Sequence, residues 1–299
     1  MAAERRCGYV AILGAPNAGK STLVNALVGA KVSIVTPKVQ TTRTRVIGIL
    51  VAGATQLVLV DTPGIFAPRR RLDRAMVAAA WQGAKDADIA CLIVDAARGF
   101  DDDSRRIAAA LKEAGRKAIL VLNKIDRVKK PSLLALAEAI NRDGAFAESF
   151  MISALGGDGV SDLRDHLAAA VPPGPWLYPE DQLSDLPLRL LAAELVREQV
   201  FLQLREELPY TSAVDVERWE ELEDGSARVH AVIYVERESQ RSIVLGKGGA
   251  RIKAIGQSAR LELEKLVGRR AHLMLHVKVQ EDWQERRELY SALRLDFDA

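Results

Sequence analysis

The feature that most constrains this chain is a glycine-rich octapeptide between an apolar run and a helical stretch. It matches the pattern G-x-x-x-x-G-K-[ST] and consists of Gly14, Ala15, Pro16, Asn17, Ala18, Gly19, Lys20 and Ser21. Its glycines allow a tight loop whose backbone N–H groups point inward at phosphate, and the following helix adds its positive end. The pattern predicts a strand, a phosphate-binding loop and a helix, and so an α/β domain.

The rest of the N-terminal half alternates short apolar runs with helical stretches. We expect strands at residues 8–13, 46–51, 56–60, 89–94, 118–122 and about 148–152. We expect helices at residues 75–84, 104–114, 132–140 and 160–170. Such alternation predicts a mostly parallel six-stranded sheet with helices on both faces, and the meander at 46–60 supplies an antiparallel edge pair.

Each phosphate-site residue is expected to have a definite role. Lys20 reaches the β- and γ-phosphates, and Ser21 ligates Mg²⁺, with Thr22 directly behind it. Asp61 ends a strand, where it can hold Mg²⁺ through water, and the Gly64 N–H can meet the γ-phosphate. The run Asp61, Thr62, Pro63 and Gly64 is therefore expected to sense the third phosphate.

Two further motifs indicate that the base is guanine. Asn123, Lys124 and Asp126 follow a strand, and the Asp126 carboxylate can accept from the ring N–H and the amine of guanine. Adenine lacks both donors. Ser153 and Ala154 follow the sixth strand, where a backbone N–H can contact the guanine carbonyl. In this order the motifs predict GTP and GDP as ligands, with Mg²⁺.

The loop at residues 36–43 is expected to be the first switch. One of its two threonines would complete the Mg²⁺ shell, and we favour Thr42 over Thr41. Many GTPases carry a glutamine after Asp-x-x-Gly to orient water, but Ile65 stands there, so slow unassisted hydrolysis is expected. The Asn17 side chain could hold K⁺ beside the phosphates; alternatively, it only braces the loop by hydrogen bonds.

The second half follows a proline-rich stop at Pro172, Pro173 and Pro175, which predicts a stiff linker. Beyond it we expect a helix at 186–204, strands at 213–219 and 227–235, helices at 239–245 and 250–266, and a strand at 272–279. No apolar run is long enough to span a bilayer and no signal peptide is evident, so a cytoplasmic protein is expected. The two cysteines, Cys7 and Cys91, are expected to be reduced core thiols.

A basic cluster surrounds a Gly-x-x-Gly turn in this second half. Residues 237–270 contain nine Lys or Arg against three Glu, a local charge of +6 in a chain of net charge +2. A turn of this kind between two helices can clamp a nucleic-acid backbone while bases lie in an apolar groove. The residues expected to contact RNA are Arg241, Gly246, Lys247, Gly248, Gly249, Arg251 and Lys253.

Together with the nucleotide motifs, the second-half sequences E-L-P-Y at 207–210, V-E-R-E at 235–238 and V-L-G-K-G-G-A-R-I-K at 244–253 resemble the Era family of bacterial ribosome-assembly GTPases. The resemblance runs over nearly the whole chain. It implies a P-loop GTPase domain at 1–171, a linker at 172–182 and a type II KH domain, of α+β class, at 183–299. The lysine of the turn is shifted by one position, because relatives often have Asn-Lys-Gly where this chain has Lys247, Gly248 and Gly249.

The resemblance also implies the partners. They are 16S ribosomal RNA near its 3′ end, the 30S subunit during assembly, and peripheral contact with the cytoplasmic face of the inner membrane; the chain is expected to be a monomer. An alternative function is a membrane-associated signalling GTPase whose basic cluster binds anionic lipid. A GTPase for RNA modification is a third, which no catalytic cysteine or cofactor fingerprint supports.

Overall fold

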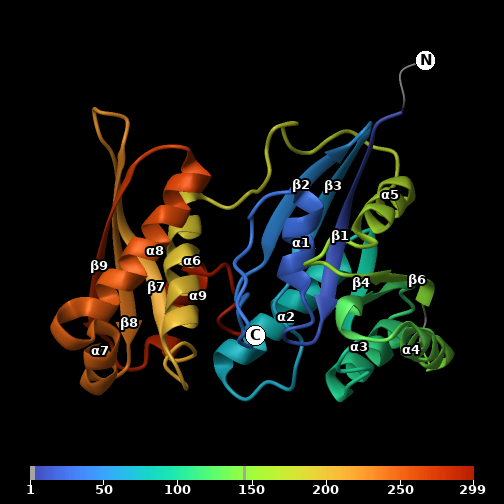
Figure 1. Cartoon of the computed structure of the whole chain (residues 1–299), viewed down its shortest axis with the longest axis horizontal. Coiled ribbons are helices and arrows are strands. Elements are labelled where there is room, and N and C mark those ends of the chain that lie inside the picture. The colour runs from blue at the N-terminus through green and yellow to red at the C-terminus, as the bar shows by residue number, and fades with distance from the viewer. Residues whose placement is uncertain (1–3, 144–145) are drawn as a thin grey trace. The chain divides into compact units, whose positions relative to one another are not determined.

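The computed structural model describes residues 4–143 and 146–299. The chain divides into two compact units, each of which has its own sheet (Figure 1). The first comprises Met1–Ser33, Thr42–Asp185 and Asp298–Ala299, and the second comprises Ile34–Thr41 and Leu186–Phe297. The segment Ile34–Thr41, which contains most of the expected first switch, thus groups with the C-terminal unit.

A six-stranded sheet of order β2-β3-β1-β4-β5-β6 forms the centre of the first unit. Its strands are β1 (Arg6–Gly14), β2 (Val46–Ala52), β3 (Thr55–Asp61), β4 (Ile89–Asp95), β5 (Ala118–Asn123) and β6 (Phe146–Ile152). All neighbours pair in parallel except β2 and β3, which form an antiparallel edge pair. The predicted topology is confirmed, and each strand extends one or two residues beyond at least one of its predicted ends.

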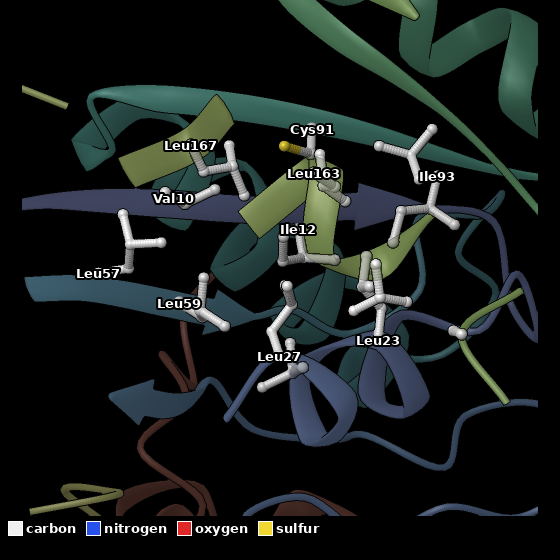
Figure 2. Packing of buried hydrophobic residues seen from close by; sticks show 14 of the residues in the cluster. Val10, Ile12, Leu23, Leu27, Leu57, Leu59, Cys91, Ile93, Leu163 and Leu167 are labelled. Atoms are coloured by element: carbon white, nitrogen blue, oxygen red, sulfur yellow. The ribbon is translucent and has the colours of Figure 1, made fainter. Parts of the chain in front are cut away.

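Helices cover both faces of this sheet, because its strands are apolar on both sides. The helices are α1 (Lys20–Val28), α2 (Arg71–Asp86), α3 (Asp102–Glu113), α4 (Lys130–Asp143) and α5 (Val160–Ala170). Side chains of α1 and α5 share one buried cluster with alternate residues of the strands, as Figure 2 shows for Leu23 and Leu163 against Ile12. Side chains of α2, α3 and α4 pack on the opposite face. The carboxyl ends of β1, β3, β4 and β5 therefore lie at one rim, held by two packed layers.

The proline-containing stretch lies against the first unit rather than in solvent. The Gln56 side-chain oxygen accepts from the backbone N–H of Leu177 at 2.9 Å and of Tyr178 at 3.1 Å. The Ile49 N–H on edge strand β2 donates to the Leu183 carbonyl at 2.8 Å. Because an edge strand exposes unpaired backbone groups, this pairing both covers β2 and anchors the stretch.

The second unit consists of a three-stranded sheet, order β7-β8-β9, with helices α6 and α8 packed on it (Figure 1). Its elements are α6 (Leu188–Gln203), β7 (Ala213–Glu221), β8 (Ala227–Val235), α7 (Glu238–Leu245), α8 (Ala250–Val267), β9 (Ala271–Val279) and α9 (Arg287–Ala292). The strands β7 and β8 are antiparallel, and β8 and β9 are parallel. The parallel pair needs a crossover, which α7, the glycine turn and α8 supply. The order of elements expected from the sequence is confirmed.

The C-terminal residues were not assigned from the sequence. A short 3₁₀ turn, Trp283–Glu285, and helix α9 follow β9. The Trp283 side chain is completely buried, and its indole N–H donates to the Thr211 carbonyl at 3.0 Å. This segment thus adds to the core of the second unit, although its sequence is too short and too charged for a clear helical pattern.

Candidate functional site

The backbone of the glycine-rich loop requires glycine at two of its positions. It connects β1, which ends at Gly14, to α1, which begins at Lys20. A Cβ on Gly14 would lie 2.5 Å from the Ile93 carbonyl oxygen, and one on Gly19 would lie 2.2 Å from Asn123 Nδ2. Gly19 has φ +99°, in the region that favours glycine. The loop therefore keeps its shape only with glycine at both positions.

Lys20 is buried inside this loop. Its ammonium donates to the carbonyls of Gly14 at 3.1 Å and Ala15 at 3.0 Å. Burial lowers the pKa of Lys20 to about 8, against an opposing effect of the nearby Asp61 carboxylate. Anionic phosphate groups in the loop would be a better partner for this charge than two carbonyls, and their field would raise the Lys20 pKa again.

Four oxygen-bearing side chains meet beside the loop. Ser21 Oγ lies 2.8 Å from Thr42 Oγ1, and Ser33 Oγ donates to Asp61 Oδ2 at 2.6 Å. Thr42 Oγ1 lies 3.4 Å from the same Asp61 oxygen. The other oxygen, Asp61 Oδ1, is buried and accepts no hydrogen bond within the described parts of the chain. Burial raises the pKa of Asp61, while the surrounding hydroxyls and Lys20 partly oppose this.

This set of donors fits Mg²⁺. Hydroxyl and carboxylate oxygens are the ligands that Mg²⁺ prefers, and it keeps several waters that an unpaired carboxylate oxygen can hold. Of the two threonines left open by the sequence, Thr42 lies at this position. Thr41 Oγ1 instead forms a hydrogen bond with Thr36 Oγ1 at 2.6 Å and donates to the Lys38 carbonyl at 2.7 Å.

The residues after Asp61 are fixed to the sheet. Thr62 Oγ1 donates to the Ile12 carbonyl at 2.7 Å. A Cβ on Gly64 would come within 3.0 to 3.1 Å of three atoms of Pro16, so the two loops touch at backbone distance. Ile65 donates its backbone N–H to the Gly14 carbonyl at 3.2 Å, and its side chain is buried in the core. It cannot orient a water molecule.

Asn123 connects three of the sequence motifs. Its Nδ2 donates to the Ala18 carbonyl at 2.9 Å, and its Oδ1 accepts from the Ala154 N–H at 2.9 Å. Lys124 donates to the Asn17 carbonyl at 2.7 Å. The phosphate loop and the two base motifs, which are distant in sequence, thus form one rim.

Asp126 lies at the edge of this rim. Its Oδ1 accepts from Ser153 Oγ at 2.7 Å, and Ser153 Oγ accepts from the Gly156 N–H at 3.0 Å. The Asp126 side chain keeps 45% exposure. Among residues 4–143 and 146–299, the charged group found near its second oxygen, Oδ2, is the distant Arg127 Nε at 3.9 Å. That oxygen can accept from a planar group with two adjacent donors, as guanine has.

The sequence motifs missed three residues of the site. Ser33 bonds Asp61, and Asn25 fixes Ser33 by accepting its N–H at 2.9 Å. Asp95 accepts from Lys124 at 2.7 Å and orients it. Asp95 ends a buried strand, a signal that could have been used, whereas Ser33 and Asn25 belong to no motif.

The glycine turn of the second unit has three residues with positive φ. Gly246, Gly248 and Gly249 have φ +71°, +59° and +77°, which leaves Lys247 as the turn's one side chain. Within the chain as described, Lys247 and Lys253 are exposed and form no ion pair.

Two arginines of the basic cluster already have partners within the second unit. Arg241 pairs with Glu238 at 3.2 Å. Arg251 donates to the Ile243 carbonyl at 3.0 Å. Lys247 therefore brings an exposed charge to the turn for which no ion pair is found among the described residues.

Comparison with known proteins identifies the chain. Residues 9–124 match the family described as 50S ribosome-binding GTPase, and residues 207–284 match the KH domain. The protein "GTPase Era" of Brucella suis biovar 1 (strain 1330) is 58% identical over 296 residues, which cover 99% of this chain and 95% of the relative. The chain belongs to the Era family of GTPases.

Other Era proteins agree with this assignment. The one from Bradyrhizobium diazoefficiens is 55% identical over 295 residues, covering 99% of this chain and 96% of the relative. A crystal structure of Era with MgGDPNP and nucleotides 1506–1542 of 16S ribosomal RNA has TM-score 0.92 and 39% identity, covering 97% and 98% of the two chains. A variant of Aquifex aeolicus Era bound to GDP and AlF₄⁻ has the same TM-score and identity, with 96% and 98% coverage.

The Era assignment confirms the predicted fold class, GTPase activity and guanine-nucleotide and Mg²⁺ ligands. No helix in residues 4–143 and 146–299 has the length and apolar character needed to cross a membrane.

Proposed function

We propose that this GTPase uses bound GTP to control binding of the 3′ region of 16S ribosomal RNA during assembly of the 30S subunit. The observation that supports this most is the match over 97% of the chain to an Era structure that contains MgGDPNP and that RNA. The family description of residues 9–124 names the 50S ribosome instead. That match covers only the nucleotide-binding part, so we give more weight to the relative matched over both units.

Within the nucleotide site, we assign Lys20 to the β- and γ-phosphates and Ser21, Thr42 and Asp61 to Mg²⁺. The bound Mg²⁺ would supply charge neutralisation between the β- and γ-phosphates. The two side-chain hydroxyls lie 2.8 Å apart beside a buried carboxylate, which supports this assignment. Asp126 selects guanine through Oδ2, and the hydroxyl of Ser153 holds Oδ1 in place.

Few groups near the γ-phosphate position could assist hydrolysis. Gly64 would offer its N–H to the γ-phosphate, and its contact with Pro16 leaves no space for a side chain. Because the Ile65 side chain is buried, no residue at that position can activate water, and slow unassisted hydrolysis follows. K⁺ held by Asn17 is a candidate for the missing positive charge. Asn17 lies in the loop at φ +63°, although a bracing role would also suit this conformation.

RNA would bind at the glycine turn of the KH unit. Three glycines there remove side chains from the surface, so a sugar-phosphate strand can approach the backbone closely. Lys247 and Lys253, with Arg241 and Arg251 nearby, supply positive charge. We propose a G domain at 1–171, a linker at 172–182 and an RNA-binding region at 183–299.

The test is a gel-shift titration of the full chain with RNA of nucleotides 1506–1542, in Mg·GDPNP and in Mg·GDP. Tighter binding than to a shuffled RNA, with nucleotide dependence, is expected. Flotation with vesicles of anionic lipid distinguishes this proposal from the alternative, a membrane-associated signalling GTPase whose basic cluster binds lipid. Strong flotation without RNA preference would overturn the proposal.

Three further properties belong to the same proposal. The protein binds 30S subunits, which co-sedimentation measures. It is a monomer, and it lies in the cytoplasm with peripheral contact at the membrane. Light scattering behind a sizing column measures the mass directly, and a dimer would contradict the second property. Fractionation of cells tests the third.

A further inference from the structure

The turn after strand β4 brings an arginine to the phosphate loop. Arg98 lies three residues beyond Asp95, the last residue of β4. Because β4 pairs in parallel with β1, both strands end at the same rim of the sheet. There Arg98 Nη1 donates to the carbonyl of Pro16, within the phosphate loop, at 3.3 Å. The two residues are 82 positions apart, and Arg98 belongs to none of the nucleotide motifs.

The backbone of this turn is fixed to the phosphate loop through Asp95. The Asp95 carbonyl accepts the Arg98 N–H at 3.0 Å, and its Oδ1 accepts the Ala97 N–H, also at 3.0 Å. The other oxygen of the same carboxylate accepts from Lys124 at 2.7 Å, and Lys124 also donates to the Asn17 carbonyl at 2.7 Å. The Arg98 side chain therefore starts from a defined place beside the loop.

The guanidinium of Arg98 is able to move from this position. Arg98 is exposed, and among the described residues it forms no ion pair and has the Pro16 carbonyl as its acceptor. A guanidinium carries five N–H donors, and at 3.3 Å the bond to this neutral oxygen is long. Hydrogen bonds from a guanidinium to phosphate are about twice as strong as those between neutral groups. A phosphate within reach would therefore attract Arg98 away from the carbonyl at little cost.

Pro16 lies at the end of the loop where the γ-phosphate is expected. Gly64, whose N–H is assigned to that phosphate, approaches Pro16 so closely that an added Cβ would lie 3.0 Å from Pro16 Cγ. Lys20, which is assigned to the β- and γ-phosphates, donates to the carbonyl of the preceding residue, Ala15, at 3.0 Å. The groups of Lys20, Gly64 and Arg98 thus meet around the same short segment of the loop.

We propose that Arg98 donates to the γ-phosphate of bound GTP and stabilises the charge that develops during hydrolysis. The oxygen of a water molecule bonds to the γ-phosphorus, the bond to the bridging oxygen breaks, and its electron pair stays on GDP, while the water proton passes to the released phosphate. Arg98 transfers no proton; its N–H groups offset the negative charge on the γ- and bridging oxygens. It orients no water, so unassisted hydrolysis remains slow. This inference rests on the proposed function, because it takes Lys20 and Gly64 to mark the γ-phosphate.

Arg98→Met in the full chain tests the inference, because it keeps an apolar stem and removes the charge at an exposed position. We expect the single-turnover rate of GTP hydrolysis without RNA to fall about ten- to a hundredfold, as between GTPases with and without an arginine of their own at this phosphate. Affinities for GDPNP and GDP should change less than about threefold, because the added interaction belongs mainly to the transition state. Arg98→Lys should recover part of the rate. Arg106→Met, at an exposed position of α3, should have no effect.

Binding of AlF₄⁻ to the GDP complex provides a second measurement, because it mimics the transition state. Arg98→Met should weaken it by about the same factor as the rate, and that factor should be equal in K⁺ and Na⁺. A wild-type rate in Arg98→Met would overturn the inference. So would an equal loss of GDP affinity, which means that Arg98 only braces the loop, or a loss confined to K⁺, which makes it part of a cation site. Full GTP affinity in Lys20→Ala would instead contradict the proposed phosphate site.

Discussion

Replacing Asp126 with asparagine should change the preferred base from guanine to xanthine. Ser153 Oγ accepts the Gly156 N–H at 3.0 Å and gives its own proton to Asp126 Oδ1 at 2.7 Å. In Asp126→Asn the side-chain oxygen must stay toward Ser153 to accept that proton. The amide nitrogen then replaces Oδ2, the carboxylate oxygen that faced the base.

The size of the effect follows from the hydrogen bonds lost. Guanine offers two N–H donors to Asp126, and a hydrogen bond to a charged group is worth about 1.5–3 kcal/mol. Loss of both predicts about 3–6 kcal/mol, or a reduction in GTP affinity of about 10²- to 10⁴-fold. Because the Asp126 side chain is 45% exposed, water weakens the pair, and we expect the lower half of this range. Xanthine has a carbonyl in place of the guanine amine, and it accepts from the new amide.

Competition against a fluorescent nucleotide measures the two affinities. Xanthosine triphosphate should displace it better than GTP in Asp126→Asn, and the reverse should hold in the wild type. Asp158→Asn is the matched control, because Asp158 is an exposed acid in the same loop as Ser153. An Asp126→Asn protein that still prefers GTP would refute the assigned base site.

Three other predictions address different parts of the molecule. Gly248→Asp should weaken RNA binding at least tenfold, by about 1.4 kcal/mol or more, and should leave GTP hydrolysis without RNA unchanged. Gly248 has φ +59° and open space around an added Cβ, so the substitution should cost only about 1 kcal/mol of folding free energy. Equal loss of both activities would point to misfolding. Hydrolysis should be faster in K⁺ than in Na⁺ at fixed ionic strength, and Asn17→Ala should remove the difference; a wild type indifferent to the cation contradicts the K⁺ site. Burial raises the pKa of Cys7, and that of Cys91 to about 12, so neither thiol should react with iodoacetamide at pH 8 until the protein is denatured. Rapid labelling of the folded chain would show that the core opens there.

The sequence alone determined the fold class and the order of the motifs. Runs of apolar residues mark β1 to β5 because a strand buried on both faces needs them, and the residues after each strand must lie at one rim of a parallel sheet. The phosphate loop was also readable, since few residues other than glycine permit its backbone. These signals are local, and each is carried by a few neighbouring residues.

Other features depended on contacts between residues far apart in the chain. Thr41 and Thr42 are neighbours with the same side chain, and only the tertiary structure shows that the Thr42 hydroxyl, and not that of Thr41, lies beside Ser21 Oγ. Ser33 belongs to no motif, yet it bonds Asp61, 28 positions away. No local pattern encodes such a pair, because neither residue's own segment requires the other.

The tertiary structure also decided the grouping of segments. Proline at 172, 173 and 175 predicts a linker, but hydrogen bonds from Gln56 and Ile49 attach residues 177–183 to the first unit. The segment Ile34–Thr41 groups with helix α6, more than 150 positions later, through the buried Arg197 and Glu198. Secondary structure follows from periodicity along the chain, whereas these attachments arise when a buried polar group must find a partner wherever the fold brings one.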